Sequence, residues 1–145
     1  MSVPGFKTPY DNVDTVLIRE NTEGEYSGIE HEVVDGVVQS IKLITRRASE
    51  RVLRFGFQYA ESINKAHIRV VHKATIMKMS DGLFVSTARD VAKDFPEIKF
   101  DTELLDNTCL KVCGGRCADG PTEIDIFPAD GYRPFRVPAD GLGHA

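Results

Sequence analysis

The feature that most constrains the fold is a regular alternation of short apolar runs with longer amphipathic segments. Residues 15–19, 68–72 and 98–105 are rich in apolar and β-branched side chains and have the length of buried strands. Residues 49–63 and 80–95 repeat apolar side chains at the helical period. Strands and helices that alternate in this way form β-α-β units, in which the strands run parallel. The sequence therefore predicts an α/β fold.

Two helices are expected within this alternation. Ser49 and Ser80 carry hydroxyls of the kind that accept hydrogen bonds at helix N-caps, and Pro96 is expected to end the second helix. The predicted buried face of the first helix consists of Val52, Leu53, Gly56, Phe57, Ala60 and Ile63. That of the second helix consists of Leu83, Phe84, Ala88, Val91, Ala92 and Phe95.

An antiparallel β-hairpin is predicted between the first strand and the first helix. Residues 29–34 and 37–45 are rich in β-branched side chains and are separated by Asp35-Gly36. This dipeptide favours a type I′ turn, because both of its central positions need positive φ. Apolar side chains occur on both faces of the second strand, and an isolated hairpin is only marginally stable in water. We therefore expect this hairpin arm to pair with another element or another chain.

The composition changes after Val112. Residues 113–145 hold six of the twelve glycines, four of the seven prolines and two of the three cysteines. We find no sustained helical or strand period there, which favours a disordered or loosely packed tail. The sequence is accordingly divided into a domain over residues 1–112 and a tail over residues 113–145.

Charge and hydropathy exclude several classes of function. The formal net charge is -4, which does not favour nucleic acid or an acidic membrane surface as the main partner. There is no apolar run of the roughly 18 residues needed to cross a membrane. The N-terminal residues lack the pattern of a signal or transit peptide. An odd number of cysteines without such a signal argues against a disulfide framework.

Three polar clusters follow predicted strands. The first cluster, Arg-Glu-Asn-Thr-Glu-Gly-Glu-Tyr, begins with Arg19 at the end of the first strand and ends with Tyr26. In the other two clusters, Lys73 follows the strand at 68–72, and Asp106 follows the last strand. Ligands of α/β sheets collect at the carboxyl ends of strands. The alternatives are a solvated loop in which Arg19 pairs with a local glutamate, and a surface lysine at Lys73. The three clusters together indicate a binding site more strongly than any one of them does alone.

The residue types suggest the chemistry of such a site. The planar guanidinium of Arg19 can clamp a carboxylate through two parallel hydrogen bonds. Tyr26 is a possible proton donor, and Lys73 can hold an anion or move a proton. The carboxylate of Asp106 can coordinate Mg²⁺ or act on a neighbouring lysine.

Together these clusters resemble the β-decarboxylating dehydrogenases, that is, the isocitrate/isopropylmalate dehydrogenase family. Residues 18–31 (IRENTEGEYSGIEH) resemble the substrate-loop motif of its NAD-dependent isocitrate dehydrogenases. Residues 71–82 (VHKATIMKMSDG) resemble the catalytic-lysine motif, and Leu105-Asp106 resembles the first metal-aspartate motif. The resemblance covers residues 6–112 in the same order and spacing. It implies a partial isopropylmalate-dehydrogenase-like fold with an inserted antiparallel hairpin arm.

The resemblance also implies roles for four residues. Arg19 is expected to bind a substrate carboxylate, and Tyr26 to protonate the enol that remains after CO₂ leaves. Lys73 is expected to assist proton transfer at the substrate hydroxyl, and Asp106 to contact Mg²⁺ or Mn²⁺. In this family the lysine and the aspartate serve the site of a neighbouring subunit. The expected activity is oxidative decarboxylation of isocitrate to 2-oxoglutarate with NAD, a step of the tricarboxylic acid cycle.

Several departures from the family pattern qualify this expectation. Thr75 stands where the family usually has asparagine, and an N-terminal part with a serine/asparagine substrate loop has no counterpart. After Val112 the family continues with a strand, further metal-binding aspartates and an adenosine-binding loop, but from Cys113 this sequence no longer resembles it. We therefore expect that residues 113–145 come from a truncated, mis-spliced or frameshifted reading of the gene. We therefore interpret the chain as an internal fragment, inactive in isolation, whose nucleotide-binding residues are unknown.

The expected partners are isocitrate and other isocitrate dehydrogenase subunits, in a homo- or hetero-oligomer. The parent protein is expected in the mitochondrial matrix. Two alternatives remain open at this point. One is a non-catalytic regulatory or assembly subunit that binds a tricarboxylate, and the other is a tartrate- or malate-type dehydrogenase.

Overall fold

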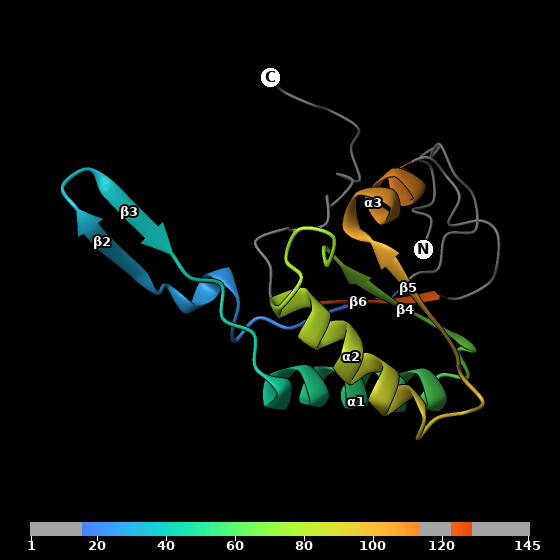
Figure 1. Cartoon of the computed structure of the whole chain (residues 1–145). Helices are drawn as coiled ribbons and strands as arrows, with labels where there is room; N and C mark the ends of the chain where they lie inside the picture. The colour runs from blue at the N-terminus through green and yellow to red at the C-terminus, as the bar shows by residue number, and fades with distance from the viewer. Residues whose placement is uncertain (1–15, 114–122, 129–145) are drawn as a thin grey trace, which may run out of the picture.

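A four-stranded parallel sheet forms the centre of the molecule (Figure 1). The computed structural model describes residues 16–113 and 123–128. The strand order is β1-β6-β4-β5, with bounds Val16–Arg19 for β1, Glu123–Phe127 for β6, His67–His72 for β4 and Lys99–Leu104 for β5. The α/β class predicted from the sequence is confirmed.

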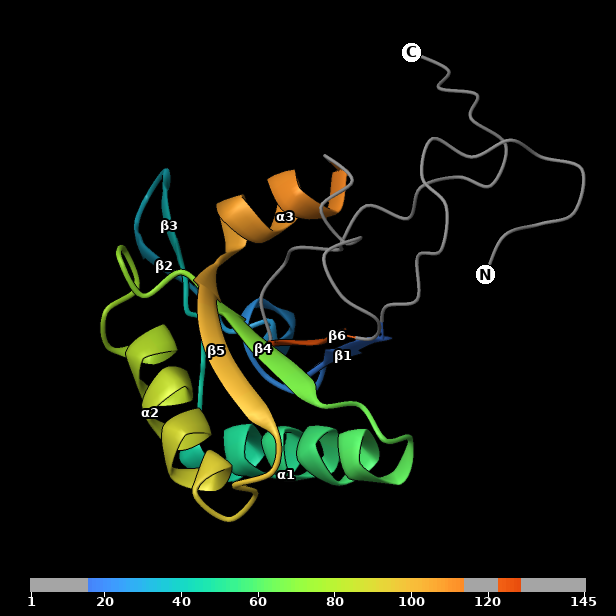
Figure 2. The same ribbon diagram turned by 90° about the vertical axis from the view of Figure 1, so that its right-hand side faces the viewer.

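Two helices cover one face of this sheet, and a third lies on the other face (Figure 2). The first two are α1, Arg46–Ser62, and α2, Ser80–Ala92. The third is α3, Leu105–Cys113, which directly follows β5. None of the helices in the described part of the chain is long and apolar enough to cross a membrane.

The main core lies between the sheet and the pair α1 and α2. Phe57 of α1 and Phe84 of α2 are almost completely buried there, with Ile68 and Val70 of β4 beneath them. A smaller apolar cluster on the other face joins Leu105 of α3 to strands β4 and β6. All predicted inner-face residues of α1 are buried except Ile63, which is 36% exposed at the end of the helix. In α2, Phe84, Ala88 and Val91 are buried, whereas Leu83, Ala92 and Phe95 are partly buried. Helix α2 ends at Ala92, three residues before the predicted end, so the expectation that Pro96 ends it is wrong.

Helix α1 begins one turn before the predicted start. Its N-cap is Thr45, which has extended backbone angles and accepts a hydrogen bond from the Ala48 amide at 3.3 Å. The expectation that Ser49 caps the helix is therefore wrong, and its hydroxyl instead donates to the Thr45 carbonyl at 2.8 Å. Ser80 is also no cap, because α2 is preceded by Met79 and makes no side-chain cap hydrogen bond.

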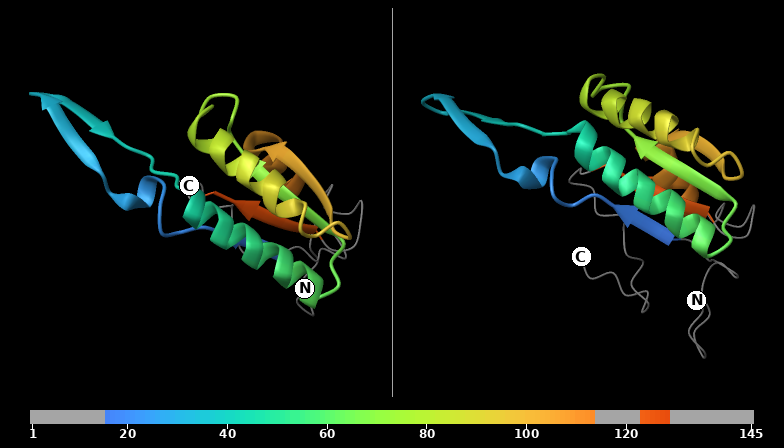
Figure 3. Two further views of the ribbon diagram at one scale, coloured as in Figure 1. Left: turned by 60° about the horizontal axis from the view of Figure 1, so that its bottom comes forward. Right: turned by 90° about the horizontal axis from the view of Figure 1, so that it is seen from below.

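The predicted hairpin projects away from the rest of the molecule as an arm (Figures 1 and 3). It consists of β2, Glu30–Val34, and β3, Val37–Ser40. Gly36 in the turn has φ of 80°, which costs glycine no steric strain. Asp35 does not have positive φ, because Asn64 is the one non-glycine residue in the described ranges that does. The turn lies where it was predicted, but the expectation that it is of type I′ is wrong. Every residue of both strands is exposed, and the exposed fractions of Val34 and Val38 are 60% and 65%. The arm therefore presents apolar side chains to solvent.

The expectation that residues 113–145 form no regular structure is wrong for the segment that forms β6. Ile124 and Ile126 are fully buried, and β6 pairs in parallel with β1 on one side and β4 on the other. Its sequence, Glu-Ile-Asp-Ile-Phe, alternates polar and apolar side chains, the pattern of a half-buried strand, but Asp125 on its polar face is also buried. The boundary at residue 112 remains a prediction, and the remainder of the predicted tail lies outside the described residues.

Helix α1 lies close to the sheet at Gly56. A Cβ at this position would lie 2.4 Å from Cδ1 of Ile126 and 3.7 Å from Cδ1 of Ile18. Because ordinary contacts between carbon atoms are about 3.5–4.0 Å, only glycine allows this approach without a shift. Gly56 thus sets the distance between α1 and the strands β1 and β6.

Candidate active site

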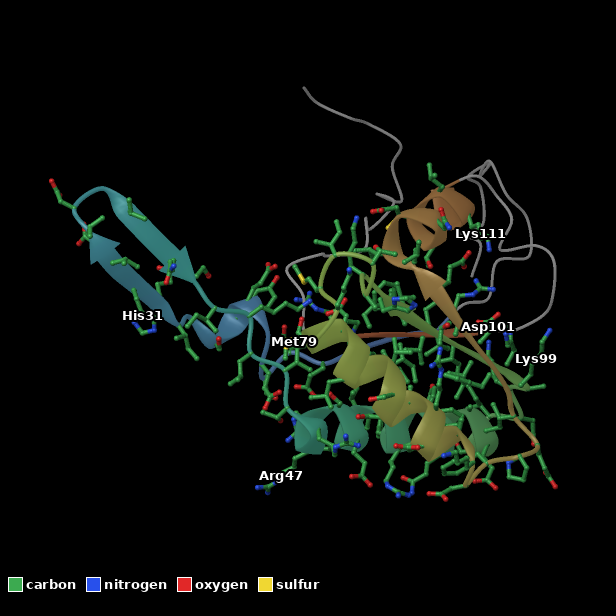
Figure 4. The ribbon with its side chains drawn as sticks, viewed as in Figure 1. His31, Arg47, Met79, Lys99, Asp101 and Lys111 are labelled. Carbon is green, nitrogen blue, oxygen red and sulfur yellow. The ribbon has the colours of Figure 1, made fainter. Side chains whose placement is uncertain are left out.

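The candidate site residues gather at the carboxyl edge of the sheet. Because all four strands are parallel, β1, β4 and β5 end at the same edge, and these ends carry or precede Arg19, Lys73 and Asp106. Figure 4 shows which way the strands run. Met79, which follows Lys73 in the sequence, lies near the root of the arm, whereas Lys99, at the start of β5, lies at the opposite end of the sheet. Strands β1 and β4 are separated only by β6, which places their axes about 10 Å apart.

Lys73 and Asp106 form a direct ion pair. The Lys73 Nζ lies 2.7 Å from Oδ1 and 2.6 Å from Oδ2 of Asp106. The two side chains are 29% and 65% exposed, so the pair contributes little to stability. Asp106 follows the last strand as expected, but β5 ends at Leu104 and Asp106 is the second residue of α3. The turn into α3 directs its carboxylate to the lysine.

Arg19 and Tyr26 form a second contact. The guanidinium carbon of Arg19 lies 4.7 Å from the centre of the Tyr26 ring, which is within the range of a cation–π interaction. Tyr26 belongs to the short 3-10 helix η1, Glu25–Ser27, and is 47% exposed. The polar loop after β1 therefore folds back so that the two candidate residues at its ends meet, with the tyrosine ring partly exposed.

Glu20 anchors the start of this loop. It is buried, accepts hydrogen bonds from the Asn21 and Thr22 amides at 3.1 and 2.7 Å, and pairs with Arg51 of α1 at 3.3 Å. Burial opposes ionisation of Glu20, but the hydrogen bonds from Thr22 and the charge of Arg51 outweigh it and hold the pKa below its usual value. The glutamate next to Arg19 is thus paired with Arg51 on α1.

Glu23 anchors the middle of the loop. Its carboxylate accepts hydrogen bonds from the amide and the hydroxyl of Thr45 at 2.8 and 2.7 Å, and Gly24 donates to the Leu43 carbonyl at 2.7 Å. Since Thr45 also caps α1, one residue connects the loop, the base of the arm and the helix. Sequence reasoning missed Glu20 and Glu23, because nothing in the sequence distinguishes them from the other glutamates of the loop.

The loop that carries Lys73 is held by two side chains. Nδ1 of His72 accepts a hydrogen bond from the Ala74 amide at 3.1 Å, and Oδ2 of Asp81 accepts one from the Lys73 amide at 2.6 Å. Burial lowers the pKa of His72, although the charge of Asp81 acts in the opposite direction. A neutral imidazole is the form that can accept through Nδ1. Asp81 lies in the motif at residues 71–82, but the sequence did not indicate this contact.

The described residues do not form a metal site by themselves. Among them there is no group of three or more histidine, cysteine, aspartate or glutamate side chains that could hold an ion. Asp106 offers one carboxylate, and both of its oxygens contact Lys73. Mg²⁺ prefers octahedral coordination by oxygen ligands, so further ligands would have to come from outside these residues.

A pocket of about 350 Å³ lies at the other end of the molecule. It is lined by residues at the ends of α1 and α2 and by the segment before β5, including Lys65, Asp94 and Pro96. None of the four candidate site residues lines it. The pocket therefore does not compete with the carboxyl edge as the candidate site.

Most of the chain is similar to known dehydrogenases. A family model described as isocitrate/isopropylmalate dehydrogenase matches residues 3–116. Isocitrate dehydrogenase (NAD) subunit 2, mitochondrial, of Schizosaccharomyces pombe is 67% identical over 112 residues, which are 77% of this chain and 30% of that protein. Isocitrate dehydrogenase (NAD) subunit alpha, mitochondrial, of Bos taurus is 52% identical over 127 residues, which are 88% of this chain and 33% of that protein.

A solved structure agrees with these matches. The crystal structure of isocitrate dehydrogenase from Methylococcus capsulatus has a TM-score of 0.78 and 35% sequence identity, and the match covers 88% of this chain and 38% of that one. The chain thus spans about a third of the length of the proteins it resembles. The alignment with the bovine protein is too long to end at residue 112, so some similarity continues into the segment predicted as a tail.

Proposed function

Because the chain belongs to the isocitrate/isopropylmalate dehydrogenase family, we propose that it is part of a subunit that oxidatively decarboxylates isocitrate to 2-oxoglutarate with NAD. The observation that carries the proposal is the arrangement of four residues at one edge of the sheet. Arg19 contacts Tyr26 across a folded loop, and Lys73 contacts Asp106 between two strand ends. The relatives named as NAD-dependent isocitrate dehydrogenase subunits support the substrate and the nucleotide.

The reaction assigns a task to each polar group. Arg19 binds a substrate carboxylate through its planar guanidinium. Oxidation at C2 removes the hydroxyl proton, and Lys73 assists that transfer. The C3 carboxylate then leaves as CO₂, and Tyr26 donates a proton to C3 of the resulting enol. NAD⁺, when bound, accepts the hydride.

Asp106 is proposed as one ligand of a divalent metal, Mg²⁺ or Mn²⁺. Its exposed carboxylate at the start of α3 is accessible from solvent. The contact with Lys73 would then serve to orient both groups before the site is complete. No step of the reaction is assigned to the metal, because the other ligands are not among the described residues.

Other subunits of an isocitrate dehydrogenase are the proposed macromolecular partners. Two features support this assignment: the relatives are themselves named as subunits, and the arm exposes Val34 and Val38. Lys73 and Asp106 are proposed to act in the site of a neighbouring subunit. The relatives are mitochondrial by name, and the mitochondrial matrix is the proposed location.

The proposal is tested in a complete subunit that contains this segment. Tyr26→Phe removes only the phenolic hydroxyl, so kcat should fall by about 10²–10⁴-fold, the usual contribution of general acid catalysis, while KM changes little. Arg19→Ala should instead raise KM strongly, since it removes a contact made in the ground state as well. Normal kcat in Tyr26→Phe, under conditions where chemistry limits the rate, would show that the tyrosine is not the proton donor.

A further inference from the structure

Asp81 is a fully buried carboxylate that no step of the proposed reaction uses. It is 0% exposed and lies in the first turn of α2. Its two oxygens contact different parts of the chain: Oδ2 accepts the hydrogen bond from the Lys73 amide at 2.6 Å, and Oδ1 lies 2.9 Å from the Lys42 ammonium. We call these two contacts the Asp81 bridge.

Lys42 belongs to the segment that returns from the arm to α1. It follows β3, and its side chain is only 10% exposed. The ammonium also lies 3.4 Å from the sulfur of Met77, in the loop between Lys73 and α2. Lys42 therefore contacts the loop that carries the candidate catalytic lysine, through Met77, and the helix that follows this loop, through Asp81.

A bridge of this kind is better suited to fixing a conformation than to adding stability. A buried ion pair gains little over apolar residues of the same volume, because both charges lose their hydration. Removing one partner is costly, since the other charge stays buried and unpaired. The Lys73 amide can therefore keep its hydrogen bond to Asp81 at low cost only while Lys42 remains in place.

We propose that Asp81 is a positioning residue for Lys73, and that Lys42 is the group through which the hairpin arm sets that position. The inference rests on the proposed role of Lys73 and deepens it. Where the arm engages a partner subunit, a displacement of its base moves Lys42, and the Asp81 bridge transmits this to the lysine loop. The pairing of Lys73 with Asp106 then depends on the state of the arm.

The test uses the complete subunit in its native assembly, with kcat, KM for isocitrate and amide hydrogen exchange as measurements. Lys42→Met removes the ammonium and keeps most of the chain length. The expected result is a 10- to 100-fold fall in kcat, the scale of a small misplacement in an active site, with KM within about twofold. Exchange of the Lys73 amide should become faster, and Lys42→Arg should restore much of the activity. Unchanged kcat together with unchanged exchange at Lys73 would overturn the inference.

Arg46→Met is the matched control. Arg46 also joins the start of α1 to α2 through an ion pair, with Asp90 at 3.8 Å, but both of these side chains are about 60% exposed. Its loss should leave kcat and the Lys73 amide unchanged. An equal loss of activity in Arg46→Met would show that the loss of any ion pair to α2 has this effect, and would contradict a specific role of the Asp81 bridge.

Two further variants separate the possible failures. If Lys42→Met does not fold, the double variant Lys42→Met with Asp81→Asn removes both buried charges while an amide oxygen remains for the Lys73 amide. It should fold but keep the reduced kcat, and a normal kcat would refute the connection to the arm.

The variant Lys73→Met tests the proposed function itself. Full activity of Lys73→Met would reject the role of the lysine. If Lys73→Met is inactive while Lys42→Met has normal activity, only the positioning role is rejected.

Discussion

Replacement of Gly56 by alanine tests whether β6 lies beneath α1. The new Cβ would lie 2.4 Å from Cδ1 of Ile126, more than 1 Å inside the ordinary contact distance. Ile126 is fully buried in a central strand, so it has little room to move. Such overpacking costs about 1–3 kcal/mol, whereas alanine gains about 0.5–1 kcal/mol over glycine in a helix. We expect Gly56→Ala to be destabilised by about 1–2 kcal/mol.

A double-mutant cycle with Ile126→Val isolates the contact. Valine lacks Cδ1, so Ile126→Val alone should cost about 0.5–1.5 kcal/mol, and the double variant should be more stable than the sum of the single effects by about 1 kcal/mol. Urea denaturation of the chain, followed by circular dichroism, measures all four free energies of unfolding.

Gly82→Ala provides the matched control for helix propensity. Gly82 lies in α2, and a Cβ there would meet nothing within 4 Å. This variant should be stabilised by about 0.5–1 kcal/mol. If Gly56→Ala is stabilised to the same extent, and its effect adds to that of Ile126→Val without coupling, then β6 does not pack against α1 and our account of the sheet is incorrect.

Two further predictions concern pH and association. Because burial lowers the pKa of His72 below 6.5, the unfolded chain binds this proton more tightly, so the stability present above pH 6.5 should be lost as the pH falls through the folded pKa. In urea denaturation between about pH 5 and 7.5, His72→Gln should reduce this loss of stability, whereas the control His31→Gln, on the exposed arm, should not. An NMR titration midpoint for His72 at or above 6.5 would contradict the prediction. The apolar arm should cause the chain to self-associate at tens of micromolar, and Val38→Lys should weaken this more than Gln39→Lys, whose side chain lies on the opposite face. Sedimentation velocity that finds only monomer in the unchanged chain would refute the second prediction.

The periodic parts of the fold could be predicted from the sequence. The helical repeat around Phe57 and Phe84 identified both helices that cover the sheet, and Asp35-Gly36 located the turn of the arm. Helix starts were less predictable, because Thr45 and Ser49 carry the same hydroxyl and only the backbone angles decide which of them caps α1.

Strand β6 was missed for a different reason. Its alternating pattern covers only Glu123–Phe127, and the surrounding glycines and prolines dominate the composition of that region. A short strand in such surroundings becomes buried because it pairs with both β1 and β4, and this pairing depends on the tertiary structure rather than on the local sequence. Its own sequence gives only a weak indication.

The candidate site was predictable only for residues with distinctive chemistry. Arg19, Tyr26, Lys73 and Asp106 stand at strand ends or in a motif that resembles a known family. Their supporting groups act through contacts that are distant in sequence, such as Glu23 with Thr45 or Asp81 with Lys42. Spacing in the sequence contains no information about these partners.

The position of β6 has a consequence for the order in which the chain can fold. Strands β4 and β5 with α2 between them are neighbours in sequence and can assemble as a local unit. Strand β1, the first strand of the described chain, pairs with β6, the last one, in the register Val16 with Ile124. During synthesis on the ribosome, β1 must therefore wait without this sheet partner until β6 has emerged. Closing so long a loop is entropically slow, so the apolar residues of β1 stay exposed for that time, and exposed apolar segments of this kind are prone to aggregate.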